Sequence, residues 1–152
     1  MKKAWKFTDG FAVLVFVAVV YASPAWAQPT KINIYDELTV WYAAHADGLA
    51  SSAAQDAVNA ALAPTAMIEL KSLALIQNKA EYLESFEGWQ EAIEGGLVAH
   101  RIDAVEGSAA RVTVCYVFEG NSSLTKETIV FNDDLQIASL VALELADSCE
   151  AF

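Results

Sequence analysis

The chain has 152 residues, of which 20 are acidic and nine are basic, so its formal net charge is −11. Proteins that bind nucleic acid or anionic lipid need a basic patch that displaces the counterions of phosphate groups. The acidic balance excludes these two classes of partner.

The N-terminal residues 1–27 have the three parts of a secretory signal peptide. Three lysines within the first six residues precede an apolar run from Phe11 to Ala22, and Ala25-Trp26-Ala27 supplies small residues before a cleavage site. The run is shorter than the roughly 20 residues that a membrane anchor needs. An uncleaved anchor and a buried N-terminal helix are the alternatives. We expect cleavage, export to the periplasm or the cell exterior, and no membrane contact afterwards.

Cleavage would leave a mature chain of residues 28–152, a length that suits one domain. It would also remove three lysines and one aspartate, which leaves six basic and 19 acidic residues and a net charge of −13. The two cysteines, Cys115 and Cys149, both belong to this mature part. In an oxidising compartment such a pair is typical of a disulfide, with two free thiols as the alternative.

Two helices and a strand are predicted first. Ile34, Leu38, Trp41 and His45 repeat at helical spacing. Ser52 and Gln55 are predicted to form a capping box for a second helix that Pro64 ends, and Ala66–Leu70 is predicted as a strand. A third helix is expected after Asn78, which has Glu81 three residues later, and Gly95-Gly96 ends it.

The period changes to two beyond Gly96. Four alternating segments begin near Val98, Val112, Glu127 and Ile137, and turn residues separate them. Helices followed by such a meander indicate an α+β domain in which the helices cover one side of a curved antiparallel sheet.

This order and three stretches of sequence make the chain similar to the nuclear transport factor 2-like superfamily, especially its SnoaL-like and ketosteroid-isomerase-like branches. The stretches are 56–69, a second helix entering a first strand; 103–114, a central hairpin; and 127–139, a hairpin into the last strand. The resemblance implies a cone, with three N-terminal helices packed in the concave face of the sheet and an apolar pocket at the open end.

In isomerase-like members, a tyrosine on the first helix and a carboxylic acid on a late strand bind a substrate carbonyl, and a carboxylate after the first strand moves a proton. In ketosteroid isomerase the late-strand acid is kept protonated and neutral by its apolar surroundings. The resemblance places Tyr42 and Glu127 at the first two positions, but it places Leu70 at the third, where no proton can be accepted. Glu69 is adjacent, yet neighbouring residues of a strand face opposite ways.

Each candidate residue has an ordinary structural alternative. Tyr42 is expected on the helix surface, and Glu127 in solvent or paired with Lys126 or a cross-strand neighbour, with the pocket as the alternative for both. His45 and His100 are expected to be structural histidines, although His100 is the best placed to titrate near neutral pH if it lines the pocket. The aromatic candidates for the pocket wall, which are equally suited to a core, are Trp41, Trp89, Tyr116 and Phe118.

Three functions fit these observations. The first is an exported protein that binds a small apolar ligand in its pocket or a partner, such as a second copy in a homodimer, on its sheet. The second is a SnoaL-like isomerase, cyclase or dehydratase that uses Tyr42, His100 and Glu127. The third is an accessory module without a ligand. The sequence has no metal-binding or cofactor-binding motif.

Overall fold

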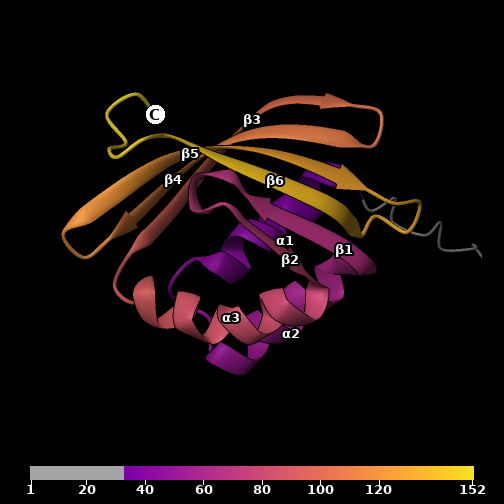
Figure 1. Cartoon of the computed structure of the whole chain (residues 1–152), viewed down its shortest axis with the longest axis horizontal. Coiled ribbons are helices and arrows are strands. Elements are labelled where there is room, and N and C mark those ends of the chain that lie inside the picture. The colour runs from indigo at the N-terminus through magenta and orange to yellow at the C-terminus, as the bar shows by residue number, and fades with distance from the viewer. Residues whose placement is uncertain (1–32) are drawn as a thin grey trace, which may run out of the picture. The chain divides into compact units, whose positions relative to one another are not determined.

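The computed structural model describes residues 33–152, and the expected signal peptide lies outside these residues. The elements, in chain order, are α1 (Ile34–His45), α2 (Ser51–Ala61), β1 (Leu62–Leu70), the short 3₁₀ helix η1 (Lys71–Leu73), β2 (Leu75–Asn78), α3 (Lys79–Ala92), β3 (Leu97–Glu106), β4 (Ala109–Phe118), β5 (Asn121–Phe131) and β6 (Ile137–Ala146). Three helices lie on one face of a six-stranded sheet with the order β2-β1-β6-β5-β4-β3 (Figure 1). The expected α+β class with a curved sheet is confirmed.

One strand pair differs from the expected antiparallel arrangement. β1 pairs with β6 in parallel, with Ile68 opposite Leu140, whereas all the other neighbouring strands are antiparallel. The parallel pair arises because β1 is followed by the β2 hairpin, helix α3 and three further strands before β6 returns beside it. The sheet is therefore mixed.

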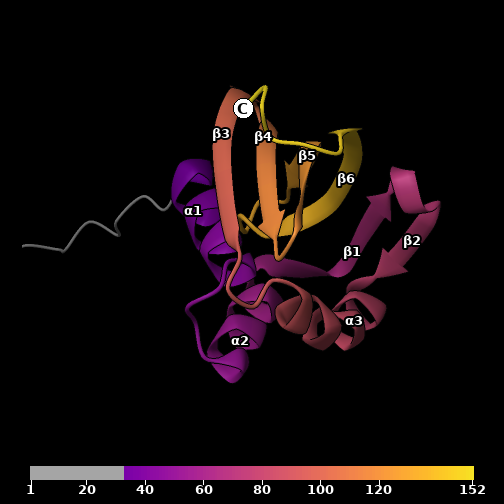
Figure 2. The same ribbon diagram turned by 90° about the vertical axis from the view of Figure 1, so that its left-hand side faces the viewer.

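Register shifts bend the sheet into a trough. They lie between Leu62 and Met67 in β1, between Ile102 and Ala104 in β3, and at both ends of the β5–β6 pair. Such irregularities bend a strand and increase its twist locally. Figure 2 shows the result, with β3 standing beside α1 and the β1–β2 hairpin lying beside α3.

The core fills the concave side of the sheet. Leu38 from α1 and Val58 from α2 are fully buried against inward side chains of the strands, which include Ile68, Val112 and Ile129. These residues follow the spacings of four in the helices and two in the strands that the sequence shows. No helix within residues 33–152 is long and apolar enough to cross a membrane.

The helix ends agree with the sequence in one case and differ in the other. The capping box of α3 is confirmed, since the Asn78 side chain accepts hydrogen bonds from the first turn and Glu81 bonds back to the Asn78 backbone. The capping box predicted at Ser52 and Gln55 is wrong, because the N-cap of α2 is Ala50, two residues before Ser52, and it makes no side-chain hydrogen bond.

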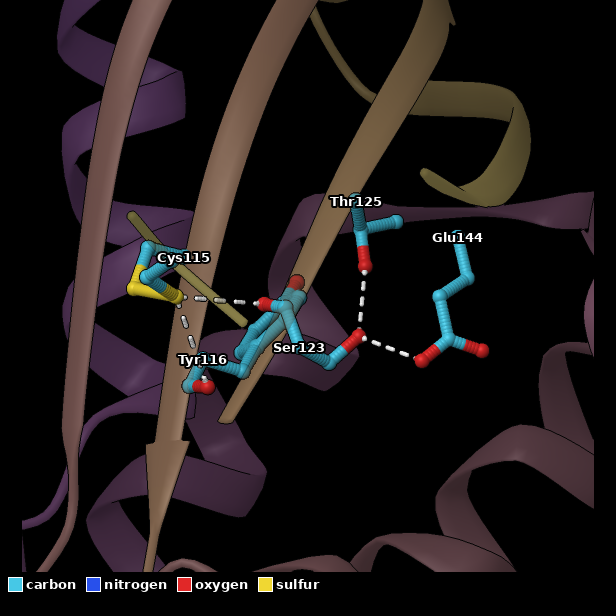
Figure 3. The surroundings of a disulfide bond; sticks show 6 residues. Cys115, Tyr116, Ser123, Thr125 and Glu144 are labelled. Carbon is cyan, nitrogen blue, oxygen red and sulfur yellow. Dashed lines mark hydrogen bonds between the residues drawn. A yellow bond between two sulfur atoms is a disulfide. The ribbon is translucent and has the colours of Figure 1, made fainter. Parts of the chain in front are cut away.

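The expected disulfide is present. Cys115 of β4 is bonded to Cys149, which follows β6, and their Cα atoms are 5.7 Å apart. Figure 3 shows the bond beside the start of β5, where the Ser123 hydroxyl donates to Glu144 over 3.1 Å. A disulfide is typical of proteins in oxidising compartments.

Candidate functional site

A cavity of about 460 Å³ lies between the concave face of the sheet, helix α3 and the β1–β2 hairpin. Its walls are mainly aromatic and aliphatic. The four aromatic residues that the sequence proposed for the pocket wall, Trp41, Trp89, Tyr116 and Phe118, all line it. The rest of the apolar wall comes from Tyr82, Phe86, Leu70, Leu73, Leu75, Leu140 and Ala142.

One buried carboxyl group, that of Glu127 on β5, lines this cavity. Tyr42 of α1 donates a hydrogen bond to Glu127 Oε2 over 2.8 Å, and Tyr116 of β4 donates one to Oε1 over 2.6 Å. Glu127 is 3% exposed and Tyr42 is 1% exposed. The expectations of a solvent-facing Glu127 and a surface Tyr42 are therefore wrong. The physical reason is that the hydroxyls of Tyr42 and Tyr116 give the buried carboxyl hydrogen bonds in place of those that it would make to water.

Burial sets the proton affinities of this triad. Loss of water raises the pKa of the Glu127 carboxyl, and the hydrogen bonds from Tyr116 and Tyr42 act in the opposite direction. Burial, followed by the adjacent Glu127, also raises the pKa of both tyrosine hydroxyls well above their ordinary value. Both phenols therefore keep their protons at neutral pH and act as donors.

His45 and Tyr82 form a second polar pair beside the cavity. His45 Nδ1 lies 2.7 Å from the Trp41 carbonyl oxygen, and Nε2 lies 2.7 Å from the Tyr82 hydroxyl. A carbonyl only accepts, so Nδ1 carries the ring proton. Burial lowers the pKa of His45 to about 4, so the ring is neutral at pH 7 and Nε2 accepts the Tyr82 proton. His45 is a satisfied, buried histidine, as expected.

His100 does not belong to the cavity wall. It is half-buried on β3, and its ring stacks on Tyr42 with centroids 4.5 Å apart. Burial lowers the pKa of its imidazole. The structure thus brings Tyr42 and Glu127 together and places His100 behind Tyr42, outside the residues that line the cavity.

The position that resemblance assigns to a proton-moving carboxylate is occupied by an apolar side chain. Leu70 lines the cavity, whereas Glu69 does not. Glu69 is paired in the sheet with Ile76 and Val141. Because side chains alternate along β1, it faces the side of the sheet opposite to Leu70. Within residues 33–152, no three His, Cys, Asp or Glu side chains come close enough to share a metal ion.

Sequence reasoning did not identify Tyr82 as the partner of His45, nor the polar rim formed by Gln77, Ser123, Thr125 and Glu144. The rim residues alternate with outward residues on β2, β5 and β6. Their inward position therefore follows from the alternation once the inward face of each strand is known. Tyr82 shares its helix face with Phe86 and Trp89, and this spacing was the available signal for its inward position.

Similarity to known proteins is found in structure and not in sequence. No family model and no curated protein sequence matches the chain. The fold is similar to that of an NTF-2 like protein of unknown function from Burkholderia xenovorans LB400, with a TM-score of 0.61 and 14% identity over 78% of this chain and 87% of that one.

Two further structures give the same result. A putative isomerase of the SnoaL-like family from Agrobacterium tumefaciens has a TM-score of 0.60 and 13% identity, over 74% of this chain and 97% of that one. A hypothetical protein with a ketosteroid isomerase-like fold from Catenulispora acidiphila, in complex with trimethylamine, has a TM-score of 0.59 and 12% identity, over 74% and 88%. The chain therefore has the nuclear transport factor 2-like fold, as its sequence predicts.

Proposed function

We propose that this protein binds a small, largely apolar molecule in the cavity between its sheet and α3. The observation that carries the proposal is an aromatic-lined hollow of about 460 Å³ that contains one buried, doubly hydrogen-bonded carboxyl group, Glu127. Ligand sites are typically hollows of this size with apolar walls and a few convergent polar groups. A small molecule in this fold has a precedent in the Catenulispora acidiphila protein and its trimethylamine.

The tryptophans offer a direct test of binding. Of the four in the chain, Trp5 and Trp26 precede residue 28, so a protein that starts there retains only Trp41 and Trp89. Both line the cavity. We expect small aromatic and alicyclic compounds to change the tryptophan emission saturably, and native mass spectrometry of the purified protein to show a retained molecule.

A pair of neighbouring substitutions separates cavity binding from surface binding. Ala142 lines the cavity, and the adjacent Val141 faces the other side of the sheet. Ala142→Phe should fill the cavity and abolish the saturable signal, whereas Val141→Phe should leave it unchanged. Equal titrations for both variants, with normal circular dichroism, would contradict a ligand site in the cavity.

The compartment of the protein is part of the same proposal. We infer that residues 1–27 direct export and are removed, so that 28–152 acts as one domain in the periplasm or outside the cell. The disulfide between Cys115 and Cys149 supports an oxidising compartment. Mass spectrometry of the protein from its native host should give an N-terminus at Gln28 and no alkylatable thiol.

Acid–base catalysis is the second candidate, and it rests on the hydrogen bond between Tyr42 and Glu127. The resemblance implies this pairing of a first-helix tyrosine with a late-strand acid. An isomerase would also need a base, and Leu70 lines the wall where that base is expected. Exchange of ligand C–H protons with deuterated solvent, lost in Glu127→Gln, would favour catalysis over binding alone.

A homodimer through the outer face of the sheet is a further proposal about partners. Met67, Leu143 and Leu145 expose about half of their surface there, and Ile76 exposes 62%. Pairing two such faces would remove these side chains from water. Light scattering at micromolar concentration should give twice the monomer mass, and Leu143→Lys should halve it.

A further inference from the structure

The charge of the cavity is unbalanced. Glu127 lies within it and Glu144 lies at its rim, while none of the described residues that line it is Lys or Arg. The described ion pairs instead lie on the outer face and the β3–β4 hairpin, where Asp103 meets Arg101 and Lys126, and Glu106 meets Arg111. A buried carboxylate without a cation is costly unless it takes up a proton or a positive partner arrives.

The walls around this carboxyl suit a positive ligand. Trp41, Tyr82, Phe86, Trp89, Tyr116 and Phe118 line the same cavity. Several of these rings meet at an angle, since the planes of Trp89 and Tyr116 are 82° apart and those of Trp89 and Phe118 are 81° apart. The negative faces of aromatic rings attract cations, and sets of such rings bind ammonium groups that carry alkyl substituents.

The hydrogen bonds around Glu127 also favour a ligand that is positively charged or donates over one that accepts. The hydroxyl proton of Tyr116 is used on Glu127, and that of Tyr82 is used on His45 Nε2. The Trp89 indole N–H is used on the His45 carbonyl oxygen over 3.0 Å. Glu127, Tyr116 and Tyr82 can therefore offer a ligand only their remaining oxygen lone pairs, which accept.

We propose that the ligand of this cavity is a small organic ammonium ion with apolar substituents, whose nitrogen lies beside Glu127 and whose substituents contact the aromatic wall. This inference rests on the proposed function of ligand binding. The bound cation would supply the counter-charge that the protein withholds from Glu127. The excess of acidic residues over the whole chain would raise the local concentration of such cations.

A matched pair of probes tests the sign of the charge. Benzyltrimethylammonium and neopentylbenzene have nearly the same shape, but a carbon replaces the charged nitrogen in the second. Transfer from water alone favours the neutral compound, because a cation must lose hydration. We expect titrations monitored by tryptophan fluorescence to show that benzyltrimethylammonium binds at least about tenfold more tightly than neopentylbenzene.

Variants matched in charge identify the group responsible. Glu127→Gln should weaken binding of the cation by about tenfold or more, and it should leave the affinity for neopentylbenzene unchanged or higher. Glu106→Gln removes the same charge from the β3–β4 hairpin, outside the cavity, and should change neither dissociation constant by more than about twofold. The comparison of the two probes on the unmodified protein remains decisive if Glu127→Gln does not fold.

The outcomes separate the two proposals. Equal or tighter binding of neopentylbenzene, with no effect of Glu127→Gln, would overturn the ammonium ligand and leave ligand binding intact. Failure of both probes to bind, with equal titrations of other small aromatic compounds in Ala142→Phe and the unmodified protein, would overturn both.

The quaternary nitrogen of the probe cannot lose a proton, so any pH dependence of its affinity belongs to the protein. The titratable groups that face Glu127 or line the cavity are Tyr42 and His45 from α1, Tyr82 from α3, Tyr116 from β4 and Glu144 from β6, and His100 of β3 stacks behind Tyr42. The tyrosines keep their protons at neutral pH, and His45 stays neutral above about pH 4. We expect affinity to rise with pH as the Glu127 carboxyl, whose pKa is raised by burial, loses its proton, and this rise to be absent in Glu127→Gln.

Discussion

Each oxygen of the Glu127 carboxyl has its own phenolic donor, and the two donors come from different layers of the fold. Tyr42 reaches it from α1, and Tyr116 reaches it from the neighbouring strand β4. Every buried side-chain nitrogen or oxygen within residues 33–152 likewise has a hydrogen-bond partner. The carboxyl therefore ties α1 to the sheet and at the same time presents its remaining lone pairs to the cavity.

Removing one donor should be costly. Tyr42→Phe keeps the ring and deletes the hydroxyl, so Glu127 stays buried with one hydrogen bond fewer. We expect a loss of about 1–3 kcal/mol in the free energy of unfolding, measured with urea. Tyr35→Phe is the control, because Tyr35 lies on the same helix and is 54% exposed. Equal effects of the two substitutions would show that the bond to Glu127 does not stabilise the fold.

His45 makes stability depend on pH in a definite direction. Burial lowers the pKa of His45 from 6.5 to about 4. Below pH 6.5 the unfolded chain therefore binds a proton at His45, whereas the folded protein binds it only near pH 4. Its contribution is therefore complete above pH 6.5 and falls by about 3 kcal/mol as the pH drops to 4.

The measurement compares the pH dependence of the unfolding free energy in two variants. His45→Gln should flatten the loss between pH 6.5 and 4, and His100→Gln should flatten less of it, since His100 is only half-buried. The raised pKa of Glu127 gives a slope of the opposite sign, in which stability falls as the pH rises above 4.5. Identical profiles for the protein and His45→Gln would contradict a neutral buried His45.

The sequence predicts the positions of Glu127 and Tyr42 better than it predicts their roles. Glu127 alternates with Ile129 and Phe131, and Tyr42 follows Leu38 by four residues, so both belong to the apolar face of their element. The expectation of a solvent-facing Glu127 follows instead from the general preference of carboxylates for water. The compensating contact joins residues 85 positions apart, and only the assembled sheet shows it.

At the scale of elements, local signals were sufficient for the helices and hairpins but not for the order of the sheet. The Asn78 capping box and the turns at Gly107 and Gly120 lie within a few residues of sequence. The parallel pairing of β1 with β6 joins residues about 70 positions apart, such as Ile68 and Leu140. No hydrophobic period specifies a partner at that distance, so the antiparallel meander was predicted and the mixed sheet was not.

Two glycines near the end of α3 should respond to the same substitution in opposite ways. A Cβ on Gly96 would collide with the carbonyl oxygen of Val117, whereas one on Gly88 would meet nothing within 4 Å. Gly96→Ala should cost about 1–3 kcal/mol, because the backbones of the α3–β3 connection and β4 would have to separate. Gly88→Ala, exposed inside the helix, should gain up to about 1 kcal/mol.

Thermal unfolding followed by circular dichroism measures both changes. The transition midpoint should fall for Gly96→Ala and rise for Gly88→Ala, relative to the unmodified protein. A neutral Gly96→Ala would show that the turn into β3 can move away from Val117 at little cost.

At the scale of the whole molecule, the cavity exists because the chain leaves the open end of its trough unfilled. α1 and α2 fill the rest of the concave face with Leu38, Val58 and their neighbours, whereas α3 and the β1–β2 hairpin enclose space against β5 and β6. The parallel β1–β6 pair supplies Leu70, Leu140 and Ala142 to the wall of this cavity, and the disulfide ties β4 to the segment that follows β6.

The disulfide should stabilise the molecule without taking part in ligand binding. Cys115 and Cys149 are 34 residues apart, and closing a loop of this length removes unfolded-state entropy worth about 3–4 kcal/mol. The bond lies on the outer side of β4, since Cys115 alternates with the inward Val114 and Tyr116. Replacing both cysteines by serine should therefore lower the urea midpoint strongly and change the affinity for a cavity ligand by less than about threefold. A large loss of affinity with an unchanged midpoint would instead mean that the bond shapes the rim at Ser123, whose carbonyl oxygen lies 3.6 Å from Cys149 Sγ.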